Sequence, residues 1–290
     1  MVLTSQRIGI VGAGMMGAEI ALVFALAGQQ VRLNDATKAK LDTAMANLAK
    51  VLDKGVARGF WPADAASSAL TRILPTLDLA DYADRDMVIE AVFEDEAVKS
   101  EVFRRLDQLC APDCLLASNT SSISITVLSA HVSPARRPNF LGTHFFSPVS
   151  RMKLVEIIPG LDTDPKAVEA ASEVCRAAAK TPIVVKDVVG FAVNRLLHSF
   201  LIEAMRLVEE GVAIPADIDT ACKLGLGHPI GPFEMMDIVS NSLVLQVQEV
   251  MAAAYGDRFH PSMLLKKLVK AGYDGKKAGR GWHRWNKGAT

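Results

Sequence analysis

The stretch Arg7–Asp35, RIGIVGAGMMGAEIALVFALAGQQVRLND, decides the fold of this chain. A strand-like apolar run ends at the pattern Gly12-x-Gly14-x-x-Gly17 and passes directly into a helical segment, after which a second strand-like run leads to Asp35. This order is the fingerprint of a dinucleotide-binding βαβ unit, whose glycines permit a tight turn, close approach of a pyrophosphate and close helix–strand packing. A lone glycine pattern also occurs in ordinary turns, but the order of the surrounding segments favours nucleotide binding.

The same stretch predicts which cofactor binds. Free N–H groups and the positive end of the helix attract phosphates. The residues expected at the pyrophosphate are those of the loop: Gly12, Ala13, Gly14, Met15, Met16 and Gly17. Asp35 can accept hydrogen bonds from both ribose hydroxyls, and its carboxylate would repel a 2′-phosphate. We therefore expect NAD(H) rather than NADP(H), with Arg32 and Lys38 near enough to soften this preference without reversing it.

The overall composition excludes several classes of function. The 290 residues include 32 basic and 32 acidic side chains, so no net field draws the chain to nucleic acid or to an anionic membrane. No apolar run is long enough to cross a bilayer, and Met1–Gln6 lacks the features of a signal peptide. The four cysteines show no metal-ligand spacing, which favours reduced thiols, no metal site and a cytoplasmic protein.

Alternating strand-like and helical segments predict a Rossmann-type, doubly wound and mostly parallel sheet in the first part of the chain. The later strand candidates are Met87–Val92, Leu115–Ala117, Phe140–Thr143, Leu154–Ile158 and Ile183–Val185. After Asp187 the pattern is nearly all helical, with one long helix expected over 235–254. We expect an α/β NAD-binding domain over 1–187. A smaller helical domain over 188–290 would contribute to substrate binding and to a homodimer.

Two segments carry residues suited to hydride transfer, which needs a base for a hydroxyl proton and donors for a developing oxyanion. One segment is Ser118–Ser122 and the other runs from Thr143 to Ile158. His144 and Glu156 lie on consecutive strand candidates, and a short turn between these strands would bring the carboxylate against the imidazole. From spacing alone, a catalytic base and a satisfied core histidine both stay open.

Six segments together resemble the L-3-hydroxyacyl-CoA dehydrogenase family, which includes the 3-hydroxybutyryl-CoA dehydrogenases. They follow the family's order over nearly the whole chain: GAGMMG, ASNTSS, HFFSPVSRMKLVEI, VVGFAVNRLL, GLGHPIGPFEMMD and DGKKAGRGW. The resemblance implies NAD-dependent oxidation of L-3-hydroxyacyl-CoA to 3-oxoacyl-CoA. This is a reaction of fatty acid metabolism, β-oxidation included, although the sequence does not decide the pathway or the acyl chain length.

The resemblance also implies roles for individual residues at the reacting centre. His144 matches the catalytic base, and Glu156 matches the acid that hydrogen-bonds this base. Ser121 matches a serine that contacts the substrate's 3-oxygen and the cofactor. Asn194 matches an asparagine beside the acyl-CoA, although alone it would be interpreted as a helix-start residue.

Further positions match cofactor contacts outside the glycine loop, namely Glu94, Lys99, Asn119, Ser121 and Lys277. Without the resemblance, Glu94 and Lys99 would be assigned to a solvated helix start and Lys277 to a surface tail. Ser147 stands where the family often has an asparagine that approaches the nicotinamide, so its contact would have a shorter reach.

The helix expected over 39–58 matches the segment of the family that meets the CoA nucleotide, and it departs from the pattern twice. Val51 falls where a small polar residue is common, and this change loses a hydrogen bond. Arg58 falls where a lysine is common, and it keeps the positive charge that CoA phosphates require.

Two other functions stay open. One is a dehydrogenase of CoA-free hydroxy acids, of the L-gulonate or carnitine type, although those relatives tend to carry further prolines after HP where this chain has HFFSPV. The other is a non-catalytic NAD(H)-binding sensor, since one fold hosts unrelated functions. Intact Ser121, His144, Glu156 and Asn194 favour an enzyme.

Overall fold

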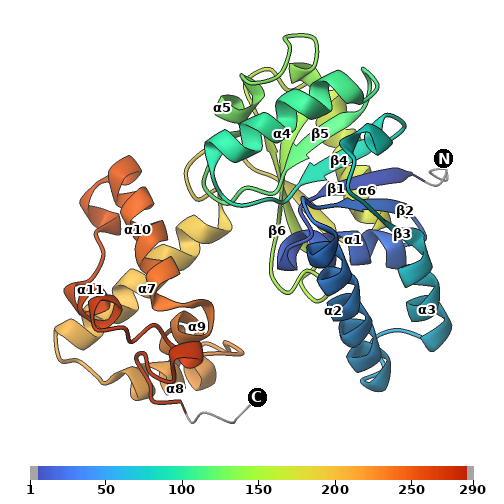
Figure 1. Ribbon diagram of the computed structural model, residues 1–290. Helices are drawn as coiled ribbons and strands as arrows, with labels where there is room; N and C mark the ends of the chain where they lie inside the picture. Colours follow the sequence, from blue (N-terminus) through green and yellow to red (C-terminus); the bar gives the residue numbers. More distant parts are fainter. Residues whose placement is uncertain (1–5, 286–290) are drawn as a thin grey trace. The chain divides into compact units, whose positions relative to one another are not determined.

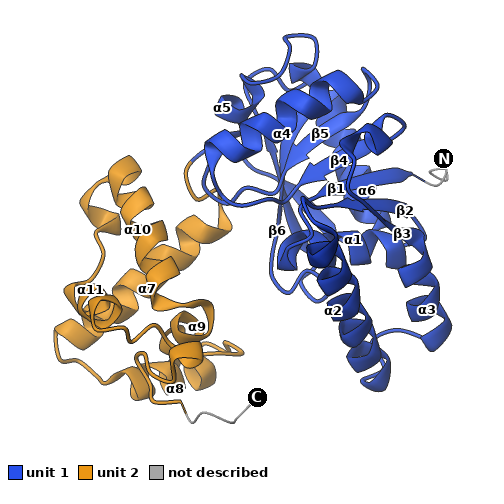
Figure 2. Ribbon diagram, viewed as in Figure 1, with its two compact units in different colours: residues 1–188 blue, residues 189–290 orange. Residues whose placement is uncertain are grey.

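The computed structural model describes residues 6–285 and divides into two compact units, Met1–Val188 (unit 1) and Val189–Thr290 (unit 2), shown in Figures 1 and 2. Most of the segment Met1–Gln6, which was expected to lack signal-peptide features, lies outside the described residues. Within residues 6–285, no helix is long and apolar enough to cross a membrane.

Unit 1 is built on one eight-stranded sheet with the order β3-β2-β1-β4-β5-β6-β7-β8. Its strands are β1 (Arg7–Val11), β2 (Gln30–Asn34), β3 (Ile73–Thr76), β4 (Met87–Glu90), β5 (Leu115–Ser118), β6 (Phe140–Phe145), β7 (Leu154–Pro159) and β8 (Thr181–Val184). Neighbouring strands are parallel except for β6 and β7, which are antiparallel. The strand order reverses between β1 and β4, so the predicted doubly wound, mostly parallel sheet is confirmed.

Helices cover both faces of this sheet. They are α1 (Met15–Leu26), α2 (Lys38–Ala57), α3 (Ala63–Arg72), α4 (Glu96–Leu109), α5 (Ile125–Ser129) and α6 (Pro165–Ala177), with the 3₁₀ turns η1 (Leu79–Tyr82) and η2 (Arg137–Asn139). The larger core joins one face of the sheet to α1, α2, α3 and α6. On the other face, where Figure 1 shows α4 and α5, the ring of Phe103 packs on that of Phe140. Strand residues alternate between these faces because the side-chain period of a strand is two.

Two glycines determine the turn from β1 into α1. Gly12 has φ +103°, and a Cβ there would lie 2.6 Å from the carbonyl oxygen of Ala91. A Cβ on Gly17 would lie 1.8 Å from the carbonyl oxygen of Gly12, so a larger residue would push α1 off the strand end. A Cβ on Gly14 would instead meet no atom within 4 Å, which leaves the start of α1 accessible.

The helices of unit 2 are α7 (Val193–Glu209), α8 (Pro215–Gly225), α9 (Pro232–Val239), α10 (Asn241–Tyr255) and α11 (Met263–Lys270), with the 3₁₀ turns η3 (Asp257–Phe259) and η4 (Lys276–Ala278). Their apolar faces meet around Phe233, Met236, Met251 and Leu265. The prediction of one helix over 235–254 was wrong. Ser240, at φ +121°, ends α9, and its hydroxyl caps α10 by accepting from the Leu243 N–H.

Candidate active site

Polar residues singled out in the sequence gather at one edge of the sheet of unit 1. Asp35 follows β2, Glu94 follows β4 and Ser121 follows β5, while His144 is the next-to-last residue of β6. Because these strands run parallel, their carboxyl ends share an edge. Ligands of open α/β sheets bind at this edge, near the point where the strand order reverses.

A cavity of ≈ 610 Å³ opens beside the glycine turn. It is lined by loop residues and by one side of α4, including Gly12, Gly14, Met15, Met16, Asp35, Ala91, Val92, Phe93, Val98, Val102 and Arg105. The open space at Gly14 and the start of α1 suit a pyrophosphate, and the apolar side chains of α4 suit an adenine ring. The residues present therefore fit an adenine dinucleotide.

Asp35 lines this cavity, and its side chain is 11% exposed. Its carboxylate accepts hydrogen bonds from the N–H groups of Ala13 (2.9 Å) and Ala36 (2.7 Å). Lys40 Nζ lies 3.2 Å from the same carboxylate. A ribose with free hydroxyls suits this group, whereas a 2′-phosphate would have to approach a negative charge.

Lys40 was missed in the sequence, which pointed to Arg32 and Lys38 as the cations near Asp35. Lys38 instead pairs with Asp42 one helical turn later, at 2.7 Å. Arg32 lies 3.7 Å from Asp81. The signal for Lys40 was its place in the first turn of α2, directly after the loop that Asp35 begins.

Glu94 organises the loop that carries Ser121. Its Oε1 accepts from the Thr120 hydroxyl (2.5 Å), from the N–H groups of Ser121 (2.9 Å) and Ser122 (3.0 Å), and from the Ser122 hydroxyl (3.0 Å). Burial acts to raise the pKa of Glu94, but Lys99 and these donors outweigh it, so the pKa lies below the usual glutamate value. This carboxylate is therefore charged near neutral pH.

Lys99 lies in α4 with 1% of its side chain exposed. Its ammonium donates to Glu90 Oε1 at 2.7 Å and lies 3.2 Å from Glu94 Oε2. Lys99 thus lies behind Glu94, with its charge directed to two carboxylates of the protein. Glu90 was missed in the sequence, where the signal was a charged residue inside the otherwise apolar run MVIEAV.

His144 is held between two side chains. Its Nδ1 lies 2.8 Å from Glu156 Oε2, and its Nε2 lies 3.0 Å from Ser121 Oγ. His144 and Glu156 are direct partners in the antiparallel pairing of β6 with β7, and both are buried. A carboxylate at Nδ1 fixes the proton there, which leaves Nε2 as the basic nitrogen beside the Ser121 hydroxyl.

Asn119 and Ser147 flank this group at the ends of β5 and β6. Asn119 Oδ1 accepts from the Phe145 N–H at 2.9 Å and so ties the two strand ends together. Ser147 is exposed in the connection to β7 and precedes a cis proline, Pro148. Nearby, the Ser150 N–H donates to Glu19 of α1 at 3.0 Å.

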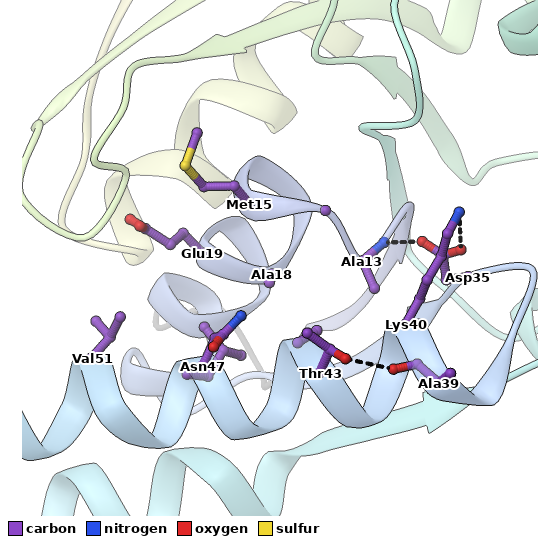
Figure 3. Close-up of a pocket in the computed structure, with 13 residues that line it drawn as sticks. Ala13, Met15, Ala18, Glu19, Asp35, Ala39, Lys40, Thr43, Asn47 and Val51 are labelled. Carbon is purple, nitrogen blue, oxygen red and sulfur yellow. Dashed lines mark hydrogen bonds and ion pairs between the residues drawn. The ribbon is translucent and has the colours of Figure 1, made fainter. Parts of the chain in front are cut away.

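A second cavity of ≈ 550 Å³ lies between α1 and α2, and Figure 3 shows its lining side chains. Glu19, Thr43, Asn47 and Val51 line it, and Lys40 reaches both this cavity and the one beside the glycine turn. Val51 is therefore part of a cavity wall, as a substrate contact requires. Arg58 follows α2 as an exposed residue and is not among the lining residues.

Asn194 and Lys277 belong to unit 2. Asn194 is half-buried in the first turn of α7, and Lys277 is exposed in η4.

The segment after η4 is held by Asp237 of α9. Its carboxylate accepts from the N–H groups of Trp282 and His283, both at 2.9 Å, and from Trp285 Nε1 at 2.8 Å. Among residues 6–285 there is no group of three or more His, Cys, Asp or Glu side chains that could hold a metal ion.

An α/β unit with a dinucleotide cavity and a Ser–His–Glu group at its strand ends defines a Rossmann-type dehydrogenase. Residues 7–188 match the family model described as 3-hydroxyacyl-CoA dehydrogenase, NAD binding domain. Residues 190–285 match the C-terminal domain of the same family. The chain belongs to the 3-hydroxyacyl-CoA dehydrogenase family, which confirms the resemblance seen in the sequence.

Similar proteins align over nearly the full length. A probable 3-hydroxybutyryl-CoA dehydrogenase of Deinococcus radiodurans is 40% identical over 281 residues, which cover 97% of this chain and 100% of the relative. A 3-hydroxybutyryl-CoA dehydrogenase of Clostridioides difficile is 37% identical over 284 residues, which cover 97% of this chain and 100% of the relative. The crystal structure of (S)-3-hydroxybutyryl-CoA dehydrogenase from Ralstonia eutropha superposes with a TM-score of 0.93 at 38% identity, covering 98% of this chain and 100% of that one.

Proposed function

We propose that this protein catalyses the reversible, NAD-dependent oxidation of L-3-hydroxyacyl-CoA to 3-oxoacyl-CoA, with His144 as the base. The single observation that carries the proposal is the His144 imidazole held between Ser121 Oγ and Glu156 Oε2 at the strand ends. Family membership and the cofactor cavity support it.

The proposed role of each side chain follows from its hydrogen bonds. The Glu156 carboxylate accepts the Nδ1 proton of His144, so Nε2 can take the proton of the substrate's C3 hydroxyl. The imidazolium that forms is stabilised by the adjacent carboxylate. The Ser121 hydroxyl, now bonded to Nε2, would turn to the substrate oxygen. NAD, when bound, supplies the acceptor for the C3 hydride.

Residues outside this group have proposed binding roles. The glycine loop and Asp35 would hold the adenosine diphosphate part of NAD, while Asn119, Ser147 and, from unit 2, Lys277 would contact its remainder. Glu94 would contact the nicotinamide half of NAD. Lys99 would hold the Glu94 carboxylate in place from the side away from the cofactor. Asn194 would contact the acyl-CoA. The cavity between α1 and α2, which includes Val51, would take part of CoA, with Arg58 attracting a phosphate.

The assembly and location that we propose are a homodimer formed through unit 2, in the cytoplasm. Large apolar side chains remain exposed on this unit, notably Leu196, Leu224 and Leu226. Exposed apolar side chains that gather into a patch mark protein interfaces, so these leucines are the candidates for the dimer contact. The four cysteines are free and buried, which suits a reducing compartment.

The first test is NADH oxidation by the purified protein with acetoacetyl-CoA, repeated with NADPH and with the CoA-free pairs, L-gulonate or carnitine with NAD. Rapid turnover with NADH and acetoacetyl-CoA is expected. Turnover only with a CoA-free substrate would move the function to that class. Binding of NADH without any turnover would favour a sensor.

His144→Gln tests the base. We expect kcat to fall by roughly 10²- to 10⁴-fold, since general-base catalysis contributes about this much, while NADH binding is retained. His131→Gln is the matched control, because His131 lies at the surface beside Arg104 and Glu96. Unchanged turnover in His144→Gln would remove His144 from the mechanism.

A further inference from the structure

Glu90 is a fully buried carboxylate for which the proposed reaction has no direct use. It ends β4 and is the register partner of Ser118, which ends β5. Its Oε2 accepts from the Ser118 hydroxyl at 2.7 Å. Its Oε1 accepts from the Val92 N–H and from Lys99 Nζ, both at 2.7 Å. A buried carboxylate with this many donors is unusual in a strand that otherwise carries only apolar residues. Burial raises the pKa of Glu90, against the opposing effect of Lys99 and the other donors.

Lys99 connects Glu90 to Glu94, because its ammonium contacts the carboxylates of both residues. The two oxygens of the Glu94 carboxylate have different partners: Oε1 takes the four donors of residues 120–122, and Oε2 faces Lys99 at 3.2 Å. Glu94 is 36% exposed and lies outside regular secondary structure, so its own segment does not fix it. Lys99, buried in α4, ties the other oxygen of this carboxylate to a helix of the scaffold.

Ser121 is therefore held from two sides. On one side, Glu94 accepts its backbone N–H. On the other, Glu90 holds the Ser118 hydroxyl, whose oxygen accepts from the Thr120 N–H at 3.2 Å. The Ser121 hydroxyl then meets His144 Nε2 at 3.0 Å. A loop placed by charge-assisted hydrogen bonds keeps such a distance far better than a loop exposed to water.

We propose that Glu90, acting through Lys99 and Glu94, is a positioning residue that sets the place of Ser121 against His144. This inference rests on the proposed function and adds to it a residue that touches neither substrate nor cofactor. It also gives Lys99 a role different from direct cofactor contact, since its ammonium is occupied by two carboxylates.

The test compares Glu90→Gln with the double variant Glu90→Gln/Lys99→Met. The single change leaves a buried ammonium with one carboxylate, which can destabilise the fold. The double change removes the whole buried pair, and replacement of such a pair by neutral groups is often tolerated. Thermal unfolding of the double variant is therefore expected near that of the wild type, while its kcat with acetoacetyl-CoA falls ten- to hundredfold, about the cost of a small misplacement.

A thermodynamic cycle with Ser121→Ala separates positioning from a merely structural effect. In the wild-type background, Ser121→Ala lowers kcat. In the Glu90→Gln/Lys99→Met background the same change should cost little more, because Ser121 is already misplaced. Independent, multiplicative effects of the two sets of changes would overturn the proposal, as would a wild-type kcat in the double variant.

The matched control is another ion pair of unit 1, the buried Arg136 with the partly buried Asp107, whose Nε–Oδ1 distance is 3.1 Å. Arg136 also donates to the carbonyls of Cys110 and Cys114, so it secures the opposite end of β5 from Ser118. Asp107→Asn/Arg136→Met is expected to lower the unfolding temperature and to leave kcat of the folded protein unchanged.

Three outcomes separate the positioning role from the proposed function. If Lys99→Met weakens NADH binding while Glu90→Gln changes neither binding nor kcat, Lys99 contacts the cofactor directly and the positioning role is wrong. If the wild type shows no turnover with acetoacetyl-CoA, the proposed function fails and the positioning role fails with it. Wild-type turnover together with an unaffected double variant rejects the positioning role alone.

Discussion

Gly17 lies so close to Gly12 that a Cβ on Gly17 would come within 1.8 Å of the Gly12 carbonyl oxygen. The first and third glycines of the motif are therefore required by the fold itself. Gly14 differs, because a Cβ there meets no atom within 4 Å, and its φ of −65° suits any residue. Gly12 and Gly17 are thus needed for the fold, whereas Gly14 keeps space free for a ligand.

Gly14→Ala is expected to leave stability unchanged and to weaken NADH binding by about tenfold or more, because the added methyl group occupies the place where a pyrophosphate meets the backbone. Gly17→Ala is expected to lower the unfolding temperature, since backbone must shift to admit the methyl group. Thermal unfolding and NADH fluorescence titration measure both effects. Equal destabilisation by the two substitutions would refute this division of roles.

Asp35→Asn should reduce the preference for NADH over NADPH by about ten- to a hundredfold, in line with the loss of one charge repulsion partly inside a cavity. Lys40 would then have no carboxylate at 3.2 Å and would face an approaching 2′-phosphate. The ratio of kcat/KM for the two cofactors measures the change. Asp42→Asn is the control, since Asp42 pairs with Lys38 on the surface of α2, and its ratio should equal that of the wild type.

Glu156→Gln should lower kcat by roughly 10²- to 10⁴-fold, because an amide at Nδ1 neither fixes the required tautomer nor stabilises an imidazolium. NADH affinity is expected to change little. Steady-state kinetics with acetoacetyl-CoA and an NADH titration provide the two numbers. Glu169→Gln, on the exposed side of α6 beside Arg176, is the control. A Glu156→Gln enzyme with wild-type kcat would leave the His144–Glu156 contact without a catalytic role.

His198 of α7 gives unit 2 a pH dependence of stability. Burial lowers the pKa of His198 to about 4, and its Nδ1 has no hydrogen-bond partner among the described residues. A histidine that is harder to protonate in the fold than in the unfolded chain contributes stability in full above its unfolded pKa near 6.5. This contribution is lost as the pH falls from about 6.5 to about 4, and amounts to about 3 kcal/mol at most.

The free energy of unfolding should therefore decrease less between pH 7 and pH 4.5 in His198→Leu than in the wild type. Urea unfolding at a series of pH values measures this difference. His260→Gln is the control, since His260 is exposed and should leave the pH profile as it is. Parallel profiles for the wild type and His198→Leu would show that the burial of His198 does not control this dependence.

The sequence predicted those parts of the structure that depend on neighbours along the chain. The glycine turn, the doubly wound sheet and the strands bearing His144 and Glu156 follow from local patterns, and the fold was confirmed. The break at Ser240 was not predicted, because a serine is compatible with a helix, and here its hydroxyl caps α10 and also bonds to Asp274, which lies 34 residues away. Contacts of this range leave no local signal.

The site shows the same limit. The sequence suggested that Glu156 meets His144, and the strand register brings them together. It did not suggest that Lys99 is buried between Glu90 and Glu94, since charged residues at a helix start are usually solvated. Glu90 comes beside Ser118 only through the pairing of β4 with β5, so its proposed positioning role could be inferred only from the structure.

The antiparallel pairing of β6 with β7 links the chemistry to the integrity of the core. Glu156 faces away from Val155 and Ile157, which are fully buried in the large core of unit 1. Sliding β7 by a single residue would set an aliphatic side chain opposite His144 and drive the carboxylate into that core. A residue inserted or deleted between β6 and β7 is therefore tolerated only if the connecting loop absorbs the change and the register of the two strands stays the same. Whatever keeps this sheet in register therefore also keeps position 156 opposite His144.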